Sequence, residues 1–185
     1  MTETPATRDK ARTRRAILDA AEKVFTTSGY ATSLAEIAAE AGVSKSGLLH
    51  HFGSRDDLVF AVVADGVERF RQEVLDRVDL SENRPGKLLR GYVRAMCDPT
   101  GAILSAFAGN SISKVAGVVP GVAELFAEDE ARWRAELSAD GLPLERVLIV
   151  RYGAEGVAGA ISTWVIDVDD LARVRAELLR LAEPA

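Results

Sequence analysis

The chain has a single cysteine, Cys97, among its 185 residues. One thiol cannot form an intrachain disulfide or supply a CxxC or Cys/His zinc spacing, so a disulfide scaffold and a zinc module are both excluded. A lone cysteine beside Met96 is expected to be a small core residue, with a redox sensor as the alternative. We therefore expect a reducing compartment, and neither a metal nor another cofactor.

Long apolar runs are also missing. No stretch approaches the roughly 18 residues that a membrane span requires, and the amino terminus, MTETPATRDKARTRR, lacks the apolar core of a signal peptide. These absences predict a soluble, cytoplasmic protein with no membrane partner.

Signals for strands and for catalysis are lacking as well. No segment alternates apolar and polar residues as a half-buried strand does, and no phosphate loop, nucleotide fingerprint or nucleophile–base motif is present. The carboxylate runs Glu128-Asp129-Glu130 and Asp167 to Asp170 are interpreted as solvated helix ends. We expect an all-α protein that is not an enzyme.

The charge that is present is unevenly distributed. The net charge is -5, yet residues 1–55 carry 8 Lys and Arg against 6 Asp and Glu, which leaves this part at +2. Residues 1–8 are expected to be a disordered arm. The basic positions that follow, Arg12, Arg14 and Arg15 among them, suit contact with phosphates, with a solvated helix start as the alternative. A phosphate-facing head on an acidic body fits this distribution.

The chain is organised around residues 33–52, SLAEIAAEAGVSKSGLLHHF. Ser33 and Glu36 form the reciprocal pair of a capping box, which predicts a helix beginning at about Leu34. Gly42 suits the left-handed end of that helix, and Ser44 suits the cap of the next one, at about 45–51. Two helices joined by so tight a turn are a helix-turn-helix unit, whose second helix enters the DNA major groove.

The second helix of this unit has a small, polar and cationic amino end. Lys45 can donate to guanine or to phosphate, Ser46 can contact either, and Gly47 allows close backbone approach. His50 and His51 are adjacent and point about 100° apart on a helix, so they cannot share a metal as histidines at i and i+4 do. One of them, His51 in preference, is expected to reach a phosphate or base edge, and a packed or solvated ring is the alternative.

The block IAxxAGVSxSxLxHHF at 37–52, followed by Ser54, Arg55 and Leu58, resembles the DNA-binding domain of the TetR family of repressors over about residues 10–70. The family's recognition helix carries a tyrosine whose hydroxyl contacts a phosphate, and Leu49 stands there in this chain. The resemblance implies a homodimer, double-stranded operator DNA and a small effector. The predicted DNA-binding residues are Arg14, Ser33, Ser44, Lys45, Ser46, Gly47, Leu49, His50, His51 and Arg55.

The remaining helices define a second domain. We assign residues 9–55 to the helix-turn-helix domain, 56–80 to a connecting helix, and 85–185 to a ligand-binding and dimerisation domain. Further helices are expected at about 87–97, 103–118, 120–139, 144–165 and 169–181.

Two sites are expected in the second domain. An apolar pocket would accept an apolar or amphipathic effector, and plain core packing is the alternative. Gly153, Gly156 and Ala160 share one helix face, which favours a dimer interface over close packing inside the monomer. The predicted pocket residues are Tyr92, Met96, Ile103, Phe107, Asn110, Trp133, Tyr152 and Trp164.

Taken together, these patterns predict a ligand-released repressor that binds a palindromic operator as a dimer. An activator of the same fold, and a helical ligand-binding or enzymatic protein with a vestigial head, are the alternatives.

Overall fold

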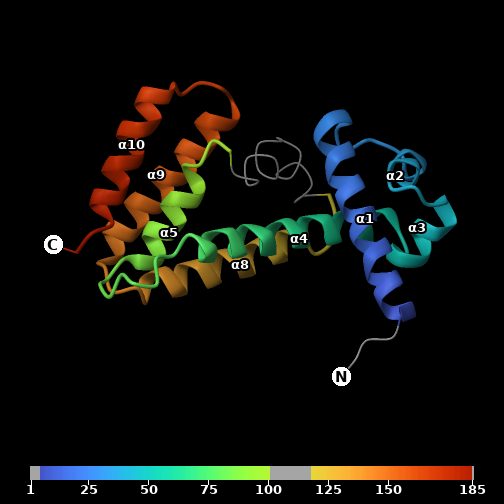
Figure 1. Cartoon of the computed structure of the whole chain (residues 1–185), viewed down its shortest axis with the longest axis horizontal. Helices are drawn as coiled ribbons and strands as arrows, with labels where there is room; N and C mark the ends of the chain where they lie inside the picture. The colour runs from blue at the N-terminus through green and yellow to red at the C-terminus, as the bar shows by residue number, and fades with distance from the viewer. Residues whose placement is uncertain (1–4, 101–117, 185) are drawn as a thin grey trace. The chain divides into compact units, whose positions relative to one another are not determined.

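The computed structural model describes residues 5–100 and 118–184, and every regular element within them is a helix (Figure 1). The all-α prediction is confirmed. The predicted helix at 103–118 lies almost entirely outside the described residues. In the described part of the chain, no helix combines the length and apolarity needed to cross a membrane.

The described residues form two compact units. Unit 1 comprises residues 5–65 and 118–123, and unit 2 comprises residues 66–100 and 124–184. The boundary falls inside α4 (Arg55–Asp76) and near the start of α8 (Val122–Ser138), so each of these helices has residues in both units. The predicted connecting helix is therefore divided between the two units.

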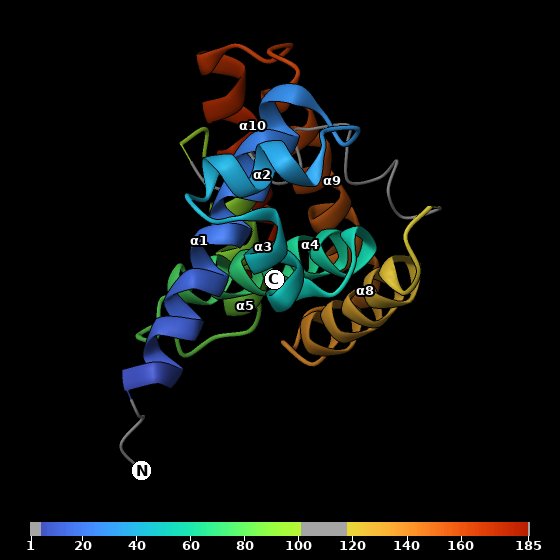
Figure 2. The same cartoon turned by 90° about the vertical axis from the view of Figure 1, so that its right-hand side faces the viewer.

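Unit 1 is built on α1 (Pro5–Ser28), α2 (Leu34–Glu40), α3 (Lys45–Phe52) and the first part of α4. The helix α1 lies beside α2 and α3 in both views (Figures 1 and 2). Its buried stripe, which includes Ile17, Ala21 and Phe25, packs in a core that also contains Ile37 and Leu48. Burying this apolar stripe is what fixes the helix-turn-helix unit on α1.

The amino-terminal prediction needs a correction, because α1 begins at Pro5 and residues 5–8, expected to be disordered, are helical. Proline suits the first turn of a helix, where an amide has no intrahelical acceptor. At the other end of α1, Gly29 follows Ser28 with φ +81°, and its amide donates to the carbonyl oxygen of Phe25 at 3.1 Å.

Unit 2 contains the rest of α4 and α8 together with α5 (Lys87–Met96), α9 (Leu144–Ser162) and α10 (Val168–Leu181). α9 packs against both α5 and α10 (Figure 1). At the centre of the core, the rings of Phe70, Tyr92 and Trp133 lie 5.2–5.6 Å apart between centroids. Buried Arg90 donates to the carbonyl oxygens of Pro85 and Ala182 at 2.9 and 2.8 Å, which ties the end of the chain to α5.

Two helices end earlier than predicted. α4 ends at Asp76, because the amides of Arg77 and Val78 turn to acceptors only three residues back. α9 ends at Ser162, where Trp164 takes a positive φ of 57° and the amide of Val165 donates five residues back, to the carbonyl oxygen of Ala160. A left-handed residue followed by such a bond closes a helix.

Candidate functional site

The turn between α2 and α3 has the predicted geometry. Ser33 caps α2: its hydroxyl accepts from the Glu36 amide at 3.3 Å, and a Glu36 carboxylate oxygen accepts from the Ser33 amide at 2.8 Å. Gly42 has φ +68°, a conformation that glycine adopts without strain. The Ser44 hydroxyl accepts from the Gly47 amide at 3.0 Å and thereby caps α3. The capping box and both predicted helix starts are confirmed.

α3 has one buried and one exposed face. Leu48 and Phe52 are buried in unit 1, whereas Lys45, Ser46 and His50 are exposed. Gly47 and Leu49 are half-buried beside them. We call the group Lys45, Ser46, Gly47, Leu49 and His50 the α3 surface. It offers an ammonium, a hydroxyl and an imidazole on a helix whose other side is held by the core.

Basic residues of α1 adjoin α3. The Arg14 guanidinium lies over the Phe52 ring, 5.0 Å from its centroid. Burial, together with the positive charges of His50, Lys10 and Arg14, lowers the pKa of His51 below its usual value. Its Nδ1 is buried and has no hydrogen-bond partner among the described residues. The carboxyl end of α3 therefore shares a positive field with α1, the environment that an anionic phosphate favours.

Arg55 and Ser33 are used for local structure. Both terminal nitrogens of Arg55 donate to backbone carbonyl oxygens, one to Thr32 and one to Tyr30, and the guanidinium lies 4.8 Å from the Tyr30 ring centroid. The Ser33 hydroxyl also donates to Glu36 at 2.8 Å. This geometry favours a role in holding the α1–α2 connection, and phosphate contact by Arg55 stays a prediction.

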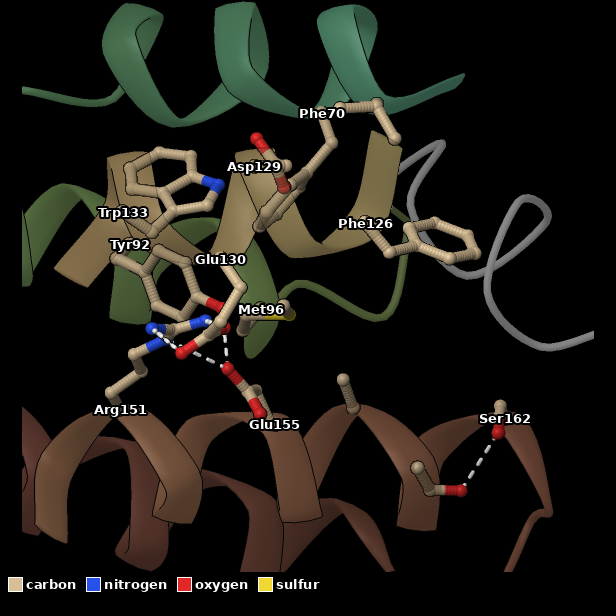
Figure 3. A pocket seen from close by; sticks show the side chains of 13 residues that line it. Phe70, Tyr92, Met96, Phe126, Asp129, Glu130, Trp133, Arg151, Glu155 and Ser162 are labelled. Carbon is tan, nitrogen blue, oxygen red and sulfur yellow. Dashed lines mark hydrogen bonds and ion pairs between the residues drawn. The ribbon is translucent and has the colours of Figure 1, made fainter. Parts of the chain in front are cut away.

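Unit 2 contains a cavity of about 470 Å³ between α4, α5, α8 and α9 (Figure 3). Tyr92, Met96 and Trp133, three of the predicted pocket residues, line it. The sequence did not predict the other lining residues. The apolar ones are Val67, Phe70, Phe126, Ala158 and Gly159, and the polar ones are Asp129, Glu130, Arg151, Glu155 and Ser162.

A buried arginine organises the polar wall. From α9, Arg151 donates to Glu155 at 2.9 Å through Nε and to both carboxylate oxygens of Glu130 on α8 through its terminal nitrogens (Figure 3). The Tyr92 hydroxyl of α5 donates to the same Glu155 oxygen at 2.8 Å. Burial raises the pKa of Tyr92, so this hydroxyl stays protonated and keeps donating. The network joins three helices around one side of the cavity.

The prediction that Asp129 and Glu130 lie at a solvated helix end was wrong about the helix end, because both lie in the middle of α8 and line the cavity. Glu130 is nevertheless exposed, whereas Asp129 is half-buried. The signal was present in Arg151 and Glu155, an i, i+4 pair and the only charged residues of α9 between Val147 and Ser162. A buried arginine needs carboxylate partners, and the facing helix supplies one.

Two predicted pocket residues lie elsewhere. Tyr152 is 53% exposed, because it follows Arg151 by one position and so points about 100° away around α9. Trp164 is 93% exposed and borders a separate hollow with Pro99 and Ile166. Ile103, Phe107 and Asn110 lie outside the described residues.

The three small residues of α9 do not share one environment. A Cβ on Gly153 would come within 2.9 Å of Leu178 Cδ2, so this position serves close packing of α10 within the chain. A Cβ on Gly156 would meet nothing within 4 Å, and Ala160 is half-buried. The interface prediction was therefore wrong in treating Gly153 like the others, and it stays a prediction for Gly156 and Ala160.

Comparison with known proteins agrees with this architecture. The family described as bacterial regulatory proteins, tetR family, matches residues 17–62, and the tetracyclin repressor-like C-terminal domain matches residues 86–183. The HTH-type transcriptional regulator HbdR of Aromatoleum sp. (strain CIB) is 33% identical over 67 residues, which are 36% of this chain and 29% of that protein. The match with HbdR thus spans less than a third of that protein's length.

Solved structures show the same fold. A TetR-family transcriptional regulator from Rhodococcus sp. has a TM-score of 0.75 at 19% identity, over 92% of this chain and 97% of that chain. The multidrug binding protein EbrR, solved in complex with malachite green, has a TM-score of 0.69 at 24% identity, over 93% and 98% of the two chains. With both of its domains matched, the chain belongs to the TetR family and is a transcriptional regulator with a DNA-binding helix-turn-helix.

Proposed function

We propose that this regulator is a homodimeric repressor that binds a palindromic operator through the α3 surface and leaves it when a small molecule occupies the cavity. The observation that carries the proposal is the exposed, cationic amino end of α3, which begins at the Ser44 cap. In a helix-turn-helix, this end of the second helix contacts base edges.

Three residues of the α3 surface have a specific expected role. Lys45 would donate to guanine or phosphate, Ser46 to either, and Gly47 would admit the DNA backbone. Leu49 supplies no hydroxyl, so Arg14 and His51 would carry phosphate contacts. Repression would be steric, because the bound dimer covers the promoter.

The dimer is proposed from the outer faces of α9 and α10. Ile149 and Tyr152 are more than half exposed and share a helix face with Gly156, and Val168 and Val174 of α10 are also exposed. Apolar side chains on two adjacent helices suit a four-helix interface with a second copy. Two heads then read two half-sites roughly 34–36 Å apart.

The cavity is proposed as the effector site. Its volume of about 470 Å³ lies within the roughly 300–1,000 Å³ typical of small-molecule sites. The complex of EbrR with malachite green supports a small aromatic or amphipathic effector in a body of this fold. Release requires the effector to have a higher affinity for one of two conformations. In that conformation the spacing of the two heads does not match the half-sites of the operator.

The test is a gel shift with DNA enriched from a random pool. Wild-type protein should retain an inverted repeat, and Lys45→Ala should lower affinity for that repeat while leaving the dimer intact. Unchanged binding by Lys45→Ala would remove Lys45 from the interface.

A further inference from the structure

The polar wall of the cavity carries more negative than positive charge. Among the charged groups at and beside this wall, three arginines face four carboxylates, which leaves one negative charge uncompensated. These groups are Arg71, Arg132 and Arg151 against Asp129, Glu130, Glu136 and Glu155.

The uncompensated charge belongs to Asp129. Arg151 is ion-paired with Glu130 and Glu155, and Arg71 and Arg132 are both paired with Glu136. No ion pair or hydrogen bond among the described residues uses the Asp129 carboxylate, although it lines the cavity. Desolvation raises its pKa, which means that burial is not offset by the nearby arginines.

A second group on the same wall lacks a partner. Trp133 is 1% exposed, and its indole Nε1 has no hydrogen-bond partner among the described residues. Figure 3 shows the nitrogen edge of this indole turned toward the side on which Asp129 lies. A buried N–H without an acceptor is unfavourable, so an acceptor atom on a ligand would stabilise the site.

The remaining walls are aromatic. Phe70, Tyr92, Phe126 and Trp133 border the cavity from three helices (Figure 3). Flat apolar walls bind an aromatic ligand by area, and an uncompensated carboxylate beside them selects the sign of its charge. An anion is disfavoured because three carboxylates and one arginine line the cavity, and all three nitrogens of that arginine, Arg151, are engaged by carboxylates. Arg71 has two buried nitrogens without a partner among the described residues, but it does not line the cavity.

We propose that the effector is a flat aromatic cation bearing a hydrogen-bond acceptor, with its positive charge beside Asp129 and its acceptor at Trp133 Nε1. The regulatory role of this ligand rests on the proposed function, whereas the chemistry of its binding rests on the cavity alone. Asp129 selects the charge of the ligand, and the aromatic walls select its shape.

The test uses three fluorescent probes on the full chain without DNA: rhodamine 6G, an aromatic cation with a carbonyl acceptor; N-phenyl-1-naphthylamine, which is neutral; and its sulfonated analogue 1-anilinonaphthalene-8-sulfonate. Asp129→Asn removes the charge at nearly constant shape. Glu128→Gln is the matched control, because Glu128 is exposed, neighbours Asp129 in sequence and does not line the cavity.

Rhodamine 6G should bind wild type more tightly than the sulfonate does. Asp129→Asn should weaken rhodamine 6G about tenfold or more, the effect of losing one charge-assisted contact. Glu128→Gln should leave the affinity for rhodamine 6G unchanged. Both variants should bind the neutral probe as tightly as wild type does, which also shows that they are folded.

Equal rhodamine 6G affinity in Asp129→Asn and wild type would overturn the proposal. The proposal would also be overturned by wild type alone if wild type bound the sulfonate more tightly than rhodamine 6G. If rhodamine 6G binds as expected but fails to displace labelled operator, ligand-released repression fails while the assignment of the cavity stands.

Discussion

Gly156→Ala adds one methyl group to the outer face of α9 and separates two roles for that face. Within one chain the new Cβ would meet nothing within 4 Å. Alanine is preferred to glycine inside a helix by about 0.5–1 kcal/mol, so the free energy of unfolding of the monomer should rise by that amount.

A partner helix packed on Gly156 reverses the expectation for the dimer. Inserting a methyl into a well-packed contact costs about 1–3 kcal/mol, and a two-fold interface contains the substitution twice. The dimer should therefore weaken by roughly 2–6 kcal/mol, which is about thirtyfold or more in its dissociation constant. Sedimentation equilibrium measures this dissociation constant. Urea unfolding at protein concentrations below the dissociation constant measures the stability of the monomer.

Gly153→Ala is the control on the same helix. Its methyl would lie 2.9 Å from Leu178 Cδ2 of the same chain, so it should give no gain in monomer stability. If Gly156→Ala stabilises the monomer and dimerises with the wild-type constant, Gly156 does not lie in the interface and the proposed dimer surface is wrong.

Three further outcomes follow from single contacts. Ser44→Ala removes the acceptor for the Gly47 amide and should lower stability by about 1 kcal/mol in urea unfolding; no loss would show that the cap is dispensable. Desolvation raises the pKa of Asp98, but hydrogen bonds from Arg77 and Thr100 outweigh it and lower that pKa to about 2. Since the folded value lies below the unfolded 3.8, Asp98→Asn should cost roughly 2 kcal/mol above pH 4, with the difference fading as pH falls toward 2; a pH-independent difference would contradict this. Burial raises the pKa of the Cys97 thiol to about 11, so a thiol reagent at pH 7 should react only after unfolding, and rapid labelling would favour the redox alternative.

The helix-turn-helix was predictable because its signals are local. Ser33, Gly42 and Ser44 each act through backbone groups within about four residues, so sequence spacing alone indicates their hydrogen bonds. The same holds for the helix end at Gly29.

The polar wall and the role of Arg55 were not predictable in this way. Arg151 and Glu130 are 21 positions apart, and Arg55 reaches carbonyl oxygens 23 and 25 positions away. Such partners depend on how helices pack, and an exposed and a buried arginine look alike in one sequence. Periodicity places the neighbours Arg151 and Tyr152 on different faces of α9, but it does not tell that the charged one is buried and the aromatic one exposed.

The most direct test of the central claim is selection of bound DNA from a random duplex pool by wild type and Lys45→Ala. We predict that wild type enriches an inverted repeat with half-site centres about one helical turn apart, and that Lys45→Ala loses affinity for this repeat while remaining dimeric. Enrichment of no sequence, or of a single half-site by a monomer, would contradict it.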